Sequence, residues 1–256
     1  MLFNIGDIVT RISYDNDIFF EIIDIKDNIA YLKGINIRLE ADSILDDLIK
    51  VNDHNVIDDE RITEDITNSF NLDREEYFYL PGKILHIDGD ESYLDRCMNF
   101  YKKFNIMAYG VCLKEKDIEF EIKRYLEELN PDIVVITGHD AYYKKKNDYK
   151  NTKNFIDSVK IARSYEKNQD KLVIIAGACQ SDYEELIKAG ATFASSPKRI
   201  NIHALDPAII ASYIALYDRN KVIDIIDVLS KTKSGSDGMG GVAVKGSMYV
   251  GYPRWI

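Results

Sequence analysis

Two reactive side chains, His139 and Cys179, follow short apolar runs that end in a similar way. Residues 132–139 read Asp-Ile-Val-Val-Ile-Thr-Gly-His, and residues 171–179 read Lys-Leu-Val-Ile-Ile-Ala-Gly-Ala-Cys. Such runs predict parallel strands, and functional groups of open α/β sheets gather beyond the carboxyl ends of their strands. Taken singly, a cysteine after a strand is usually buried and a loop histidine is usually solvated. Their matched placement favours a nucleophile and its base.

Neighbouring groups would assist such a pair. Ser181 and Glu184 have the spacing of a capping box, so a helix is predicted to begin at Ser181, two residues after the cysteine. The positive end of that helix would favour the thiolate form of Cys179. We expect the backbone amides of Gly138 and Cys179 to form an oxyanion hole for the reacting carbonyl.

Strands and helices alternate from Lys83 onward, which predicts an α/β fold with a mostly parallel sheet covered on both faces. The predicted strands span residues 84–88, 106–113, 132–137, 172–176 and 191–194. Asp90, Asp117 and the capping box at Ser181 are expected to begin three of the helices. The other predicted helices span 152–167 and 206–217, while 142–151 reads as a polar loop and 222–229 as helix or strand.

The N-terminal part has a different character. Residues 6–50 contain four short segments rich in Ile, Val, Phe and Tyr, which predict a small antiparallel barrel of the SH3-like type. Residues 51–80 are crowded with acidic side chains and predict a linker with a short helix. We therefore expect a β-barrel at 1–50, an acidic linker at 51–80 and an α/β domain at 81–256. Arg61 and Arg74 are candidate self-cleavage sites in the linker.

Composition excludes several classes of protein. The 256 residues carry a net charge of −10, which argues against a nucleic-acid partner. The sequence contains neither an apolar run of 18 residues nor a basic and then apolar N-terminus, so we expect no membrane span and no signal peptide. Three cysteines, an odd number in a long chain, indicate reduced thiols in a cytosol-like compartment.

The two segments that end in Gly-His and Ala-Cys resemble the signature of caspase-like cysteine peptidases, the group that includes clostripain, gingipains and separase. In that group the strand-end histidine is the general base or acid, and the strand-end cysteine is the nucleophile. The resemblance implies a caspase-like parallel-sheet α/β/α sandwich with His139 and Cys179 as its catalytic dyad.

The chain as a whole is similar to the YabG family of sporulation-specific proteases. The similarity lies in short motifs spread along the chain, at residues 6–11, 31–34, 41–43, 87–90, 137–140 and 177–181. It implies an endopeptidase that cuts spore coat and cortex proteins after arginine. It also implies action in the mother-cell cytoplasm or the spore coat, with no metal or organic cofactor.

Asp88 ends the first predicted strand of the sheet, at the same edge as His139 and Cys179. In caspase-like enzymes that strand end helps to line the pocket for the residue before the cut. A carboxylate there would pair bidentately with the guanidinium of a substrate arginine. Asp88 or Asp90 could instead cap the following helix. Asp90 suits the cap better, which leaves Asp88 for the pocket.

The remaining candidates receive simpler interpretations. His86 lies within a predicted strand and is expected to be a satisfied core residue, as are Cys97 and Cys112. His203 follows the fifth predicted strand and is a second candidate for the base. The Gly-rich tail 234–251 lacks the Gly-Lys-Ser/Thr of a phosphate loop. We expect it to form a mobile loop over the substrate groove or a hairpin.

Two other functions are compatible with parts of the pattern. A receiver-like phosphoacceptor domain needs acids after the first and third strands and a lysine after the fifth, roles open to Asp88, Asp90, Asp140 and Lys198. Such domains also need a hydroxyl residue after the fourth strand, where this chain has Gly-Ala-Cys. The third interpretation is a non-catalytic spore coat assembly module whose β-rich N-terminus binds a partner.

Overall fold

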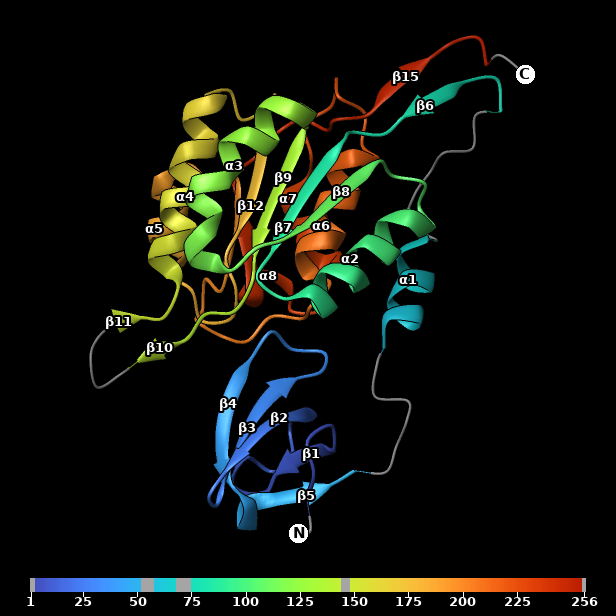
Figure 1. The fold of residues 1–256 in the computed structure, drawn as a ribbon. Coiled ribbons are helices and arrows are strands. Elements are labelled where there is room, and N and C mark those ends of the chain that lie inside the picture. The colour runs from blue at the N-terminus through green and yellow to red at the C-terminus, as the bar shows by residue number, and fades with distance from the viewer. Residues whose placement is uncertain (1–2, 52–57, 68–74, 144–147, 255–256) are drawn as a thin grey trace. The chain divides into compact units, whose positions relative to one another are not determined.

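The computed structural model describes residues 3–51, 58–67, 75–143 and 148–254, and of Tyr143 and Asp148 it describes only the backbone. The chain divides into two compact units, Met1–Asp58 and Asp59–Ile256. Figure 1 shows the helices and strands of each unit. Within the described residues, no helix is both long enough and apolar enough to cross a bilayer.

The first unit is an antiparallel sheet. Its strands are β1 (Ile8–Arg11), β2 (Phe20–Lys26), β3 (Ile29–Gly34), β4 (Glu40–Ile44) and β5 (Leu48–Lys50), in the spatial order β4-β3-β2-β1-β5. Short 3-10 turns occupy Ile12–Tyr14 and Leu45–Asp47. Alternate residues of β2 and β3 point inward, so Phe20, Ile22, Ala30 and Leu32 are fully buried. The antiparallel sheet predicted for residues 6–50 is therefore present, but it has five strands instead of four, and its fourth strand begins at Glu40.

The second unit contains a six-stranded sheet. Its strands are β7 (Ile84–Asp88), β8 (Ala108–Cys112), β9 (Ile133–Thr137), β12 (Val173–Ala176), β13 (Phe193–Ser195) and β14 (Met239–Gly241). The spatial order is β14-β13-β12-β9-β7-β8. All neighbours are parallel except β13 and β14, which are antiparallel. The predicted parallel sheet is confirmed.

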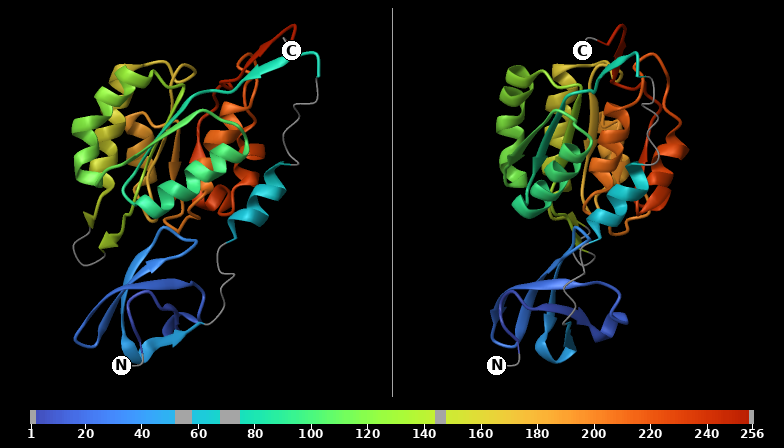
Figure 2. Two further views of the ribbon diagram at one scale, coloured as in Figure 1. Left: turned by 45° about the vertical axis from the view of Figure 1, so that its right-hand side comes forward. Right: turned by 90° about the vertical axis from the view of Figure 1, so that its right-hand side faces the viewer.

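Helices cover both faces of this sheet. They are α2 (Glu91–Lys103), α3 (Glu115–Leu129), α4 (Thr152–Tyr165), α5 (Tyr183–Ala189), α6 (Asp206–Ala215), α7 (Ile225–Lys231) and the short α8 (Gly235–Gly238). Figure 2 shows that α3, α4 and α5 lie on one face and that α2, α6 and α7 lie on the other. The second unit is therefore a three-layer α/β/α arrangement.

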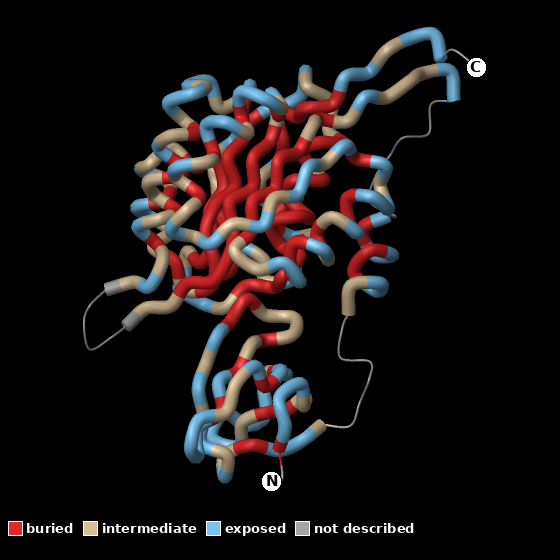
Figure 3. The backbone as a smooth tube through the Cα atoms, viewed as in Figure 1, coloured by how far each residue is buried: buried red, intermediate tan, exposed pale blue. Residues whose placement is uncertain are grey.

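The core lies between the central strands and their helices. Every residue of β7, β9 and β12 is buried, as expected for strands covered on both faces. Figure 3 shows these strands as the continuous buried centre of the unit. On the α3–α5 face, Ile118, Val134, Phe155 and Ile174 belong to one apolar cluster. This core holds the ends of the strands in fixed positions.

Smaller elements flank the sheet. Helix α1 (Asp59–Thr67) lies in the stretch predicted as a linker and carries an exposed Arg61, whereas Arg74 lies outside the described residues. Strand β6 (Phe78–Leu80) pairs with β15 (Tyr249–Gly251). The predicted polar loop after His139 is instead a hairpin of β10 (Tyr142–Tyr143) and β11 (Asp148–Tyr149).

The Gly-rich tail differs from its prediction. We predicted a mobile loop or a plain hairpin, but residues 239–241 form the edge strand β14, paired with β13. Glycine allows this because a Cβ atom on Gly241 would lie 2.4 Å from Cδ1 of Phe193. The tail therefore completes the central sheet.

Candidate active site

Three polar residues follow matched positions on three adjacent strands. On β9, Ile136 is paired with Ile87 of β7 and with Ala176 of β12. Three residues beyond these matched positions, the chain presents Asp90, His139 and Cys179 respectively. Because β9 lies between β7 and β12, the histidine follows the middle strand of the three. The expected placement of His139 and Cys179 at one sheet edge is therefore present, with an acid as a third member.

His139 is held at its ring and at both backbone polar atoms. Its Nε2 atom lies 3.0 Å from Oδ2 of Asp90, and its ring centroid lies 5.4 Å from that of Tyr93. Its N–H donates to Oε1 of Glu115 at 2.8 Å, and its carbonyl accepts from Nδ2 of Asn151 at 2.7 Å. The side chain is only 6% exposed. The imidazole is therefore fixed in orientation.

Asp90 has two roles, of which the sequence predicted one. As predicted, it is the N-cap of α2, because its Oδ1 accepts from the amides of Ser92 and Tyr93. Its Oδ2 atom binds the ring of His139, a contact that we did not predict. The available signal was its position, three residues beyond a position on β7 that is matched to β9.

Glu115 is a second residue that sequence reasoning missed. It is the first residue of α3, which begins there rather than at the predicted cap Asp117. A Cβ atom on Gly89 or Gly138 would lie 2.5 or 2.6 Å from Oε1 of Glu115, so the carboxylate rests on two glycines. This close approach lets Glu115 reach the amide of His139. Gly138 therefore has a packing role beside its predicted oxyanion role.

Cys179 is fully buried. Its Sγ atom accepts from the N–H of Ile202 at 3.3 Å and lies 3.8 Å from the carbonyl oxygen of the same residue. Ile202 belongs to the segment between β13 and α6. A substrate carbonyl can reach this sulfur only after the groups that cover it move. In this structure the sulfur is therefore inaccessible from solvent.

The predicted helix start at Ser181 is wrong. The cap of α5 is Asp182, whose side chain accepts from the amide of Glu185. Cys179 stands three residues before this cap, and α5 has only seven residues. A dipole effect falls off within one turn, so this helix gives little support to the thiolate. Ser181 makes different contacts, with Asp140 and Ala178.

The backbone around Cys179 is clamped by hydroxyl groups. The Ala178 carbonyl accepts from Oγ of Ser195 at 2.8 Å, and the Gln180 amide donates to Oγ of Ser196 at 2.9 Å. Gln180 has a positive φ of 60°, so the chain turns sharply just after the cysteine. The sharp turn and these hydroxyl contacts fix the backbone that carries the sulfur.

Asp88 is more constrained than predicted. Its Oδ1 accepts from the Asp90 amide at 2.9 Å, and its Oδ2 accepts from Oγ1 of Thr137 at 2.7 Å. The side chain is fully buried, and His86 Nε2 lies 3.5 Å from Oδ2. The expectation that capping by Asp90 leaves Asp88 without other contacts is therefore wrong. His86, which also bonds Tyr101, is the satisfied core residue that we predicted.

The sheet edge beside β7 and β8 is strongly acidic. Cys112 at the end of β8 is exposed, which corrects its prediction as a core residue. Partial burial raises the pKa of its thiol above the usual value, and negative charge near it acts in the same direction. The carboxylates responsible, in order of effect, are Asp88, Glu91, Asp90 and Glu115. Such an edge attracts cationic groups.

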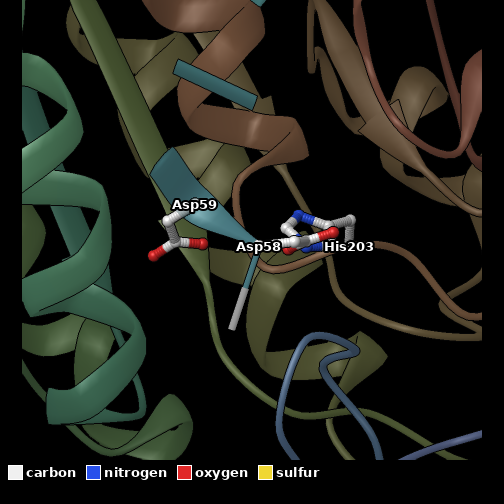
Figure 4. A group of neighbouring side chains, drawn as sticks. All are labelled: Asp58, Asp59 and His203. Atoms are coloured by element: carbon white, nitrogen blue, oxygen red, sulfur yellow. The ribbon is translucent and has the colours of Figure 1, made fainter. Parts of the chain in front are cut away.

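His203, the second candidate for the base, lies between β13 and α6, and its Nδ1 accepts from the Leu205 amide at 3.1 Å. Figure 4 shows His203 near Asp59, with ligand atoms within 4.8 Å of each other. Asp59 is committed to Arg96, whose guanidinium binds both carboxylate oxygens at 2.6 and 2.8 Å. The carboxylate of Asp59 is therefore paired with a cation of the chain itself.

Lys198 bears on the receiver-like alternative. That function requires a lysine beside Asp88 and Asp90, but the Lys198 ammonium pairs with Asp237 at 2.7 Å and is exposed. Asp140 is also committed, since four donors from its own loop, from the start of α4 and from Ser181 surround its carboxylate. Neither residue is arranged for phosphoryl transfer.

Comparison with known proteins identifies the family. A family model described as YabG peptidase U57 matches residues 4–253, a span that includes every residue of the site. The sporulation-specific protease YabG of Bacillus subtilis (strain 168) is 41% identical over 288 aligned residues, covering 99% of this chain and 99% of that protein. The chain therefore belongs to the YabG peptidase U57 family, a family of proteases.

Proposed function

We propose that this chain is a sporulation-specific cysteine endopeptidase in which Cys179 is the nucleophile and His139 the general base. The observation that carries this proposal is the matched offset of the two residues on adjacent parallel strands, β9 and β12. The family relationship supplies the protease activity, and a curated relative is named as sporulation-specific. The three-layer α/β/α unit is compatible with a caspase-like fold.

The proposed reaction uses one proton relay. The Nε2–H of His139 donates a hydrogen bond to the Asp90 carboxylate and keeps its proton. The unprotonated Nδ1 is therefore the atom that takes the thiol proton of Cys179. The sulfur attacks the scissile carbonyl, and backbone amides, with those of Gly138 and Cys179 as candidates, stabilise the oxyanion. The imidazolium then protonates the leaving amine, which leaves a thioester. Water, deprotonated by His139, hydrolyses the thioester and regenerates the thiol.

We further propose that substrates are cut after arginine. The supporting observation is the acidic edge formed by Asp88, Asp90, Glu91 and Glu115, all close enough to act on the Cys112 thiol. A guanidinium binds carboxylates bidentately and remains charged at every physiological pH. Asp88 is our candidate for the specificity residue. Asp88 is fully buried and its oxygens accept from Thr137 and the Asp90 amide, so this role requires that the residues covering it move when a substrate binds.

We also propose a class of substrate, a cellular location and a role for each part of the chain. We propose spore coat and cortex proteins as substrates, with action in the mother-cell cytoplasm or on the coat. The first unit, a five-stranded antiparallel sheet, suits an SH3-like module that recruits substrates. We keep the division into a barrel at 1–50, a linker at 51–80 and a peptidase domain at 81–256 as part of the proposal.

Alanine variants test the assignment of the dyad. Cys179→Ala and His139→Ala, each purified as the full chain, are expected to lose cleavage of an arginine-containing coat protein by at least about 10²-fold. Cys112→Ala is the matched control, because it removes another thiol near the same edge and should retain cleavage. Circular dichroism and the melting temperature verify folding. Full cleavage by a folded Cys179→Ala variant would overturn the proposal.

A further inference from the structure

Asp140, the residue after His139, is a buried carboxylate with four hydrogen-bond donors. It is only 2% exposed. Its Oδ1 accepts from the amides of Ala141 and Asn151, at 2.9 and 2.8 Å. Its Oδ2 accepts from the hydroxyls of Thr152 and Ser181, the latter at 2.8 Å. A buried carboxylate is stable only when its oxygens are satisfied in this way.

The Ser181 hydroxyl connects the Asp140 carboxylate to the loop that contains Cys179. Ser181 is fully buried, and its Oγ donates to Asp140 while accepting from the Ala178 amide at 3.0 Å. Ala178 directly precedes Cys179. A continuous chain of hydrogen bonds therefore runs from the backbone beside the sulfur to the residue beside the imidazole, across 41 positions of sequence.

Asp140 is also connected to the backbone of His139 through the start of α4. Asn151, whose amide binds Asp140, donates its side chain to the carbonyl of His139 at 2.7 Å. Thr152, which also binds Asp140, accepts from the amide of Asp182 at 3.2 Å. The loops that carry His139 and Cys179 are thus joined through a single carboxylate.

We propose that Asp140 and Ser181 form a positioning pair that sets the separation of the His139 imidazole and the Cys179 sulfur. This inference rests on the proposed function. Neither residue acts on the substrate itself, and their effect passes through the backbone of the two reactive residues. Hydrogen bonds to a buried carboxylate are about twice as strong as neutral ones, so this contact restrains the loops effectively.

The pair should affect the chemical step rather than substrate binding. Proton transfer between imidazole and sulfur requires near-contact geometry, and a misplacement of about 1 Å can reduce the rate about 10²-fold. Substrate affinity depends on other surfaces, such as the acidic edge beside β7 and β8. Loss of the pair is therefore expected to lower kcat and to leave KM nearly unchanged.

The central experiment compares two serine-to-alanine changes at fully buried positions. Ser181→Ala removes the hydroxyl that binds Asp140. Ser158→Ala on α4 removes an equally buried hydroxyl, which donates to the carbonyl of Asn154 at 2.8 Å and, among the described residues, binds no carboxylate. We expect kcat to fall by about 10- to 100-fold in the first variant only. The melting temperature should fall more in Ser181→Ala, which removes a hydrogen bond to a buried carboxylate, so kcat is compared at a temperature at which both variants are folded.

A double-mutant cycle tests whether one bond carries the effect. Asp140→Asn keeps the shape of the side chain but places an amide group against donors. If the two residues act through their mutual bond, the double variant should lose little more kcat than the worse single variant. Multiplied losses would show independent structural effects and overturn the inference. Ser181→Thr, which keeps the hydroxyl, serves as a second probe and should retain most of kcat.

The outcomes separate this inference from the proposed function. Full cleavage by Cys179→Ala would remove the dyad and this inference with it. Loss of cleavage by Cys179→Ala together with an unchanged kcat for folded Ser181→Ala would reject only the positioning role. A rise in KM at constant kcat would likewise reject it, because that pattern would place Ser181 in substrate binding.

Discussion

The Nε2 atom of His139 lies 3.0 Å from Oδ2 of Asp90, while the other oxygen of that carboxylate binds the first amides of α2. One side chain thus caps a helix and orients the proposed base. The orientation of the imidazole is therefore tied to the start of α2, which is itself packed against β7 and β8. Movement of either element would be transmitted to the ring.

Replacement of Asp90 separates its two roles. Asparagine caps helices as well as aspartate does, so Asp90→Asn should leave the unfolding free energy almost unchanged. If its oxygen stays on the α2 amides, its NH₂ group faces the ring and holds Nε2 as an acceptor. The other ring nitrogen then carries the proton and cannot take one from the thiol. We expect kcat to fall by about 10²-fold or more.

Two further variants control that prediction. Asp90→Ala should lose the same activity and, in addition, about 1 kcal/mol of stability, because the cap is removed. Asp95→Asn changes an exposed acid on the same helix and should leave kcat intact. Steady-state kinetics and urea unfolding measure both quantities. Normal kcat in Asp90→Asn would contradict the orienting role.

Gly138→Ala should disturb the histidine from its backbone side. The added Cβ would meet Oε1 of Glu115 at 2.6 Å, so the carboxylate must move away from the amide of His139. We expect kcat to fall by about tenfold or more, because the residue before the proposed base shifts. Gly110→Ala is the control, since its new Cβ would meet side-chain atoms of Met98 at 3.0 Å and of Leu94 at 3.3 Å rather than a residue that binds His139. Equal kinetics in the two variants would refute the bracing role of Glu115.

The exposed thiol of Cys112 reports the acidity of the site edge. Its pKa is raised by partial burial and by the carboxylates near it, so less thiolate is present at any pH below that value. Iodoacetamide should therefore alkylate Cys112 more slowly than an unstructured cysteine peptide at pH 8. Peptide mapping by mass spectrometry assigns the modified residue. Glu91→Gln removes one negative charge and should accelerate the reaction, as should added salt.

The same measurement has its own control. Glu128→Gln removes an exposed charge at the far end of α3 and should leave the alkylation rate of Cys112 unchanged. A Cys112 rate above that of the free peptide would mean that the edge is not acidic. That result would also remove the electrostatic support for arginine recognition.

Asp88 is tested through substrate choice. Peptides with arginine before the cut are compared with peptides that carry citrulline, which has a similar shape and no charge. If Asp88 binds the guanidinium, Asp88→Asn should reduce the preference for arginine by about 30-fold, or about 2 kcal/mol. Cleavage of the citrulline peptide should change much less. An unchanged preference in a folded variant would assign specificity to another acid of the edge.

The placement of the two reactive residues could be predicted because local signals agreed. Runs of Val and Ile mark β9 and β12 as buried strands, and a small residue ends each run. The cap at Asp90 was predicted for the same reason, since it depends only on the next three residues. Parallel pairing then brings strand ends together without further information.

The supports of the site could not be predicted from local pattern. The bond from His139 to Glu115 spans 24 positions and that from Ser181 to Asp140 spans 41, so both depend on packing in three dimensions. Ser181 had the spacing of a cap, but its hydroxyl binds the buried Asp140 carboxylate, and Asp182 caps α5 instead. A strong tertiary bond outweighed a weak local preference.

Strand β14 has a consequence for the order in which the enzyme matures. The hydroxyls of Ser195 and Ser196 hold the backbone beside Cys179, and these serines pair with residues 238–239 near the C-terminal tail. A ribosome makes that tail after the histidine and the cysteine have already emerged. A nascent chain therefore displays both reactive groups before their support exists. The backbone beside Cys179 should therefore reach its final arrangement only after residues 238–241 have been made.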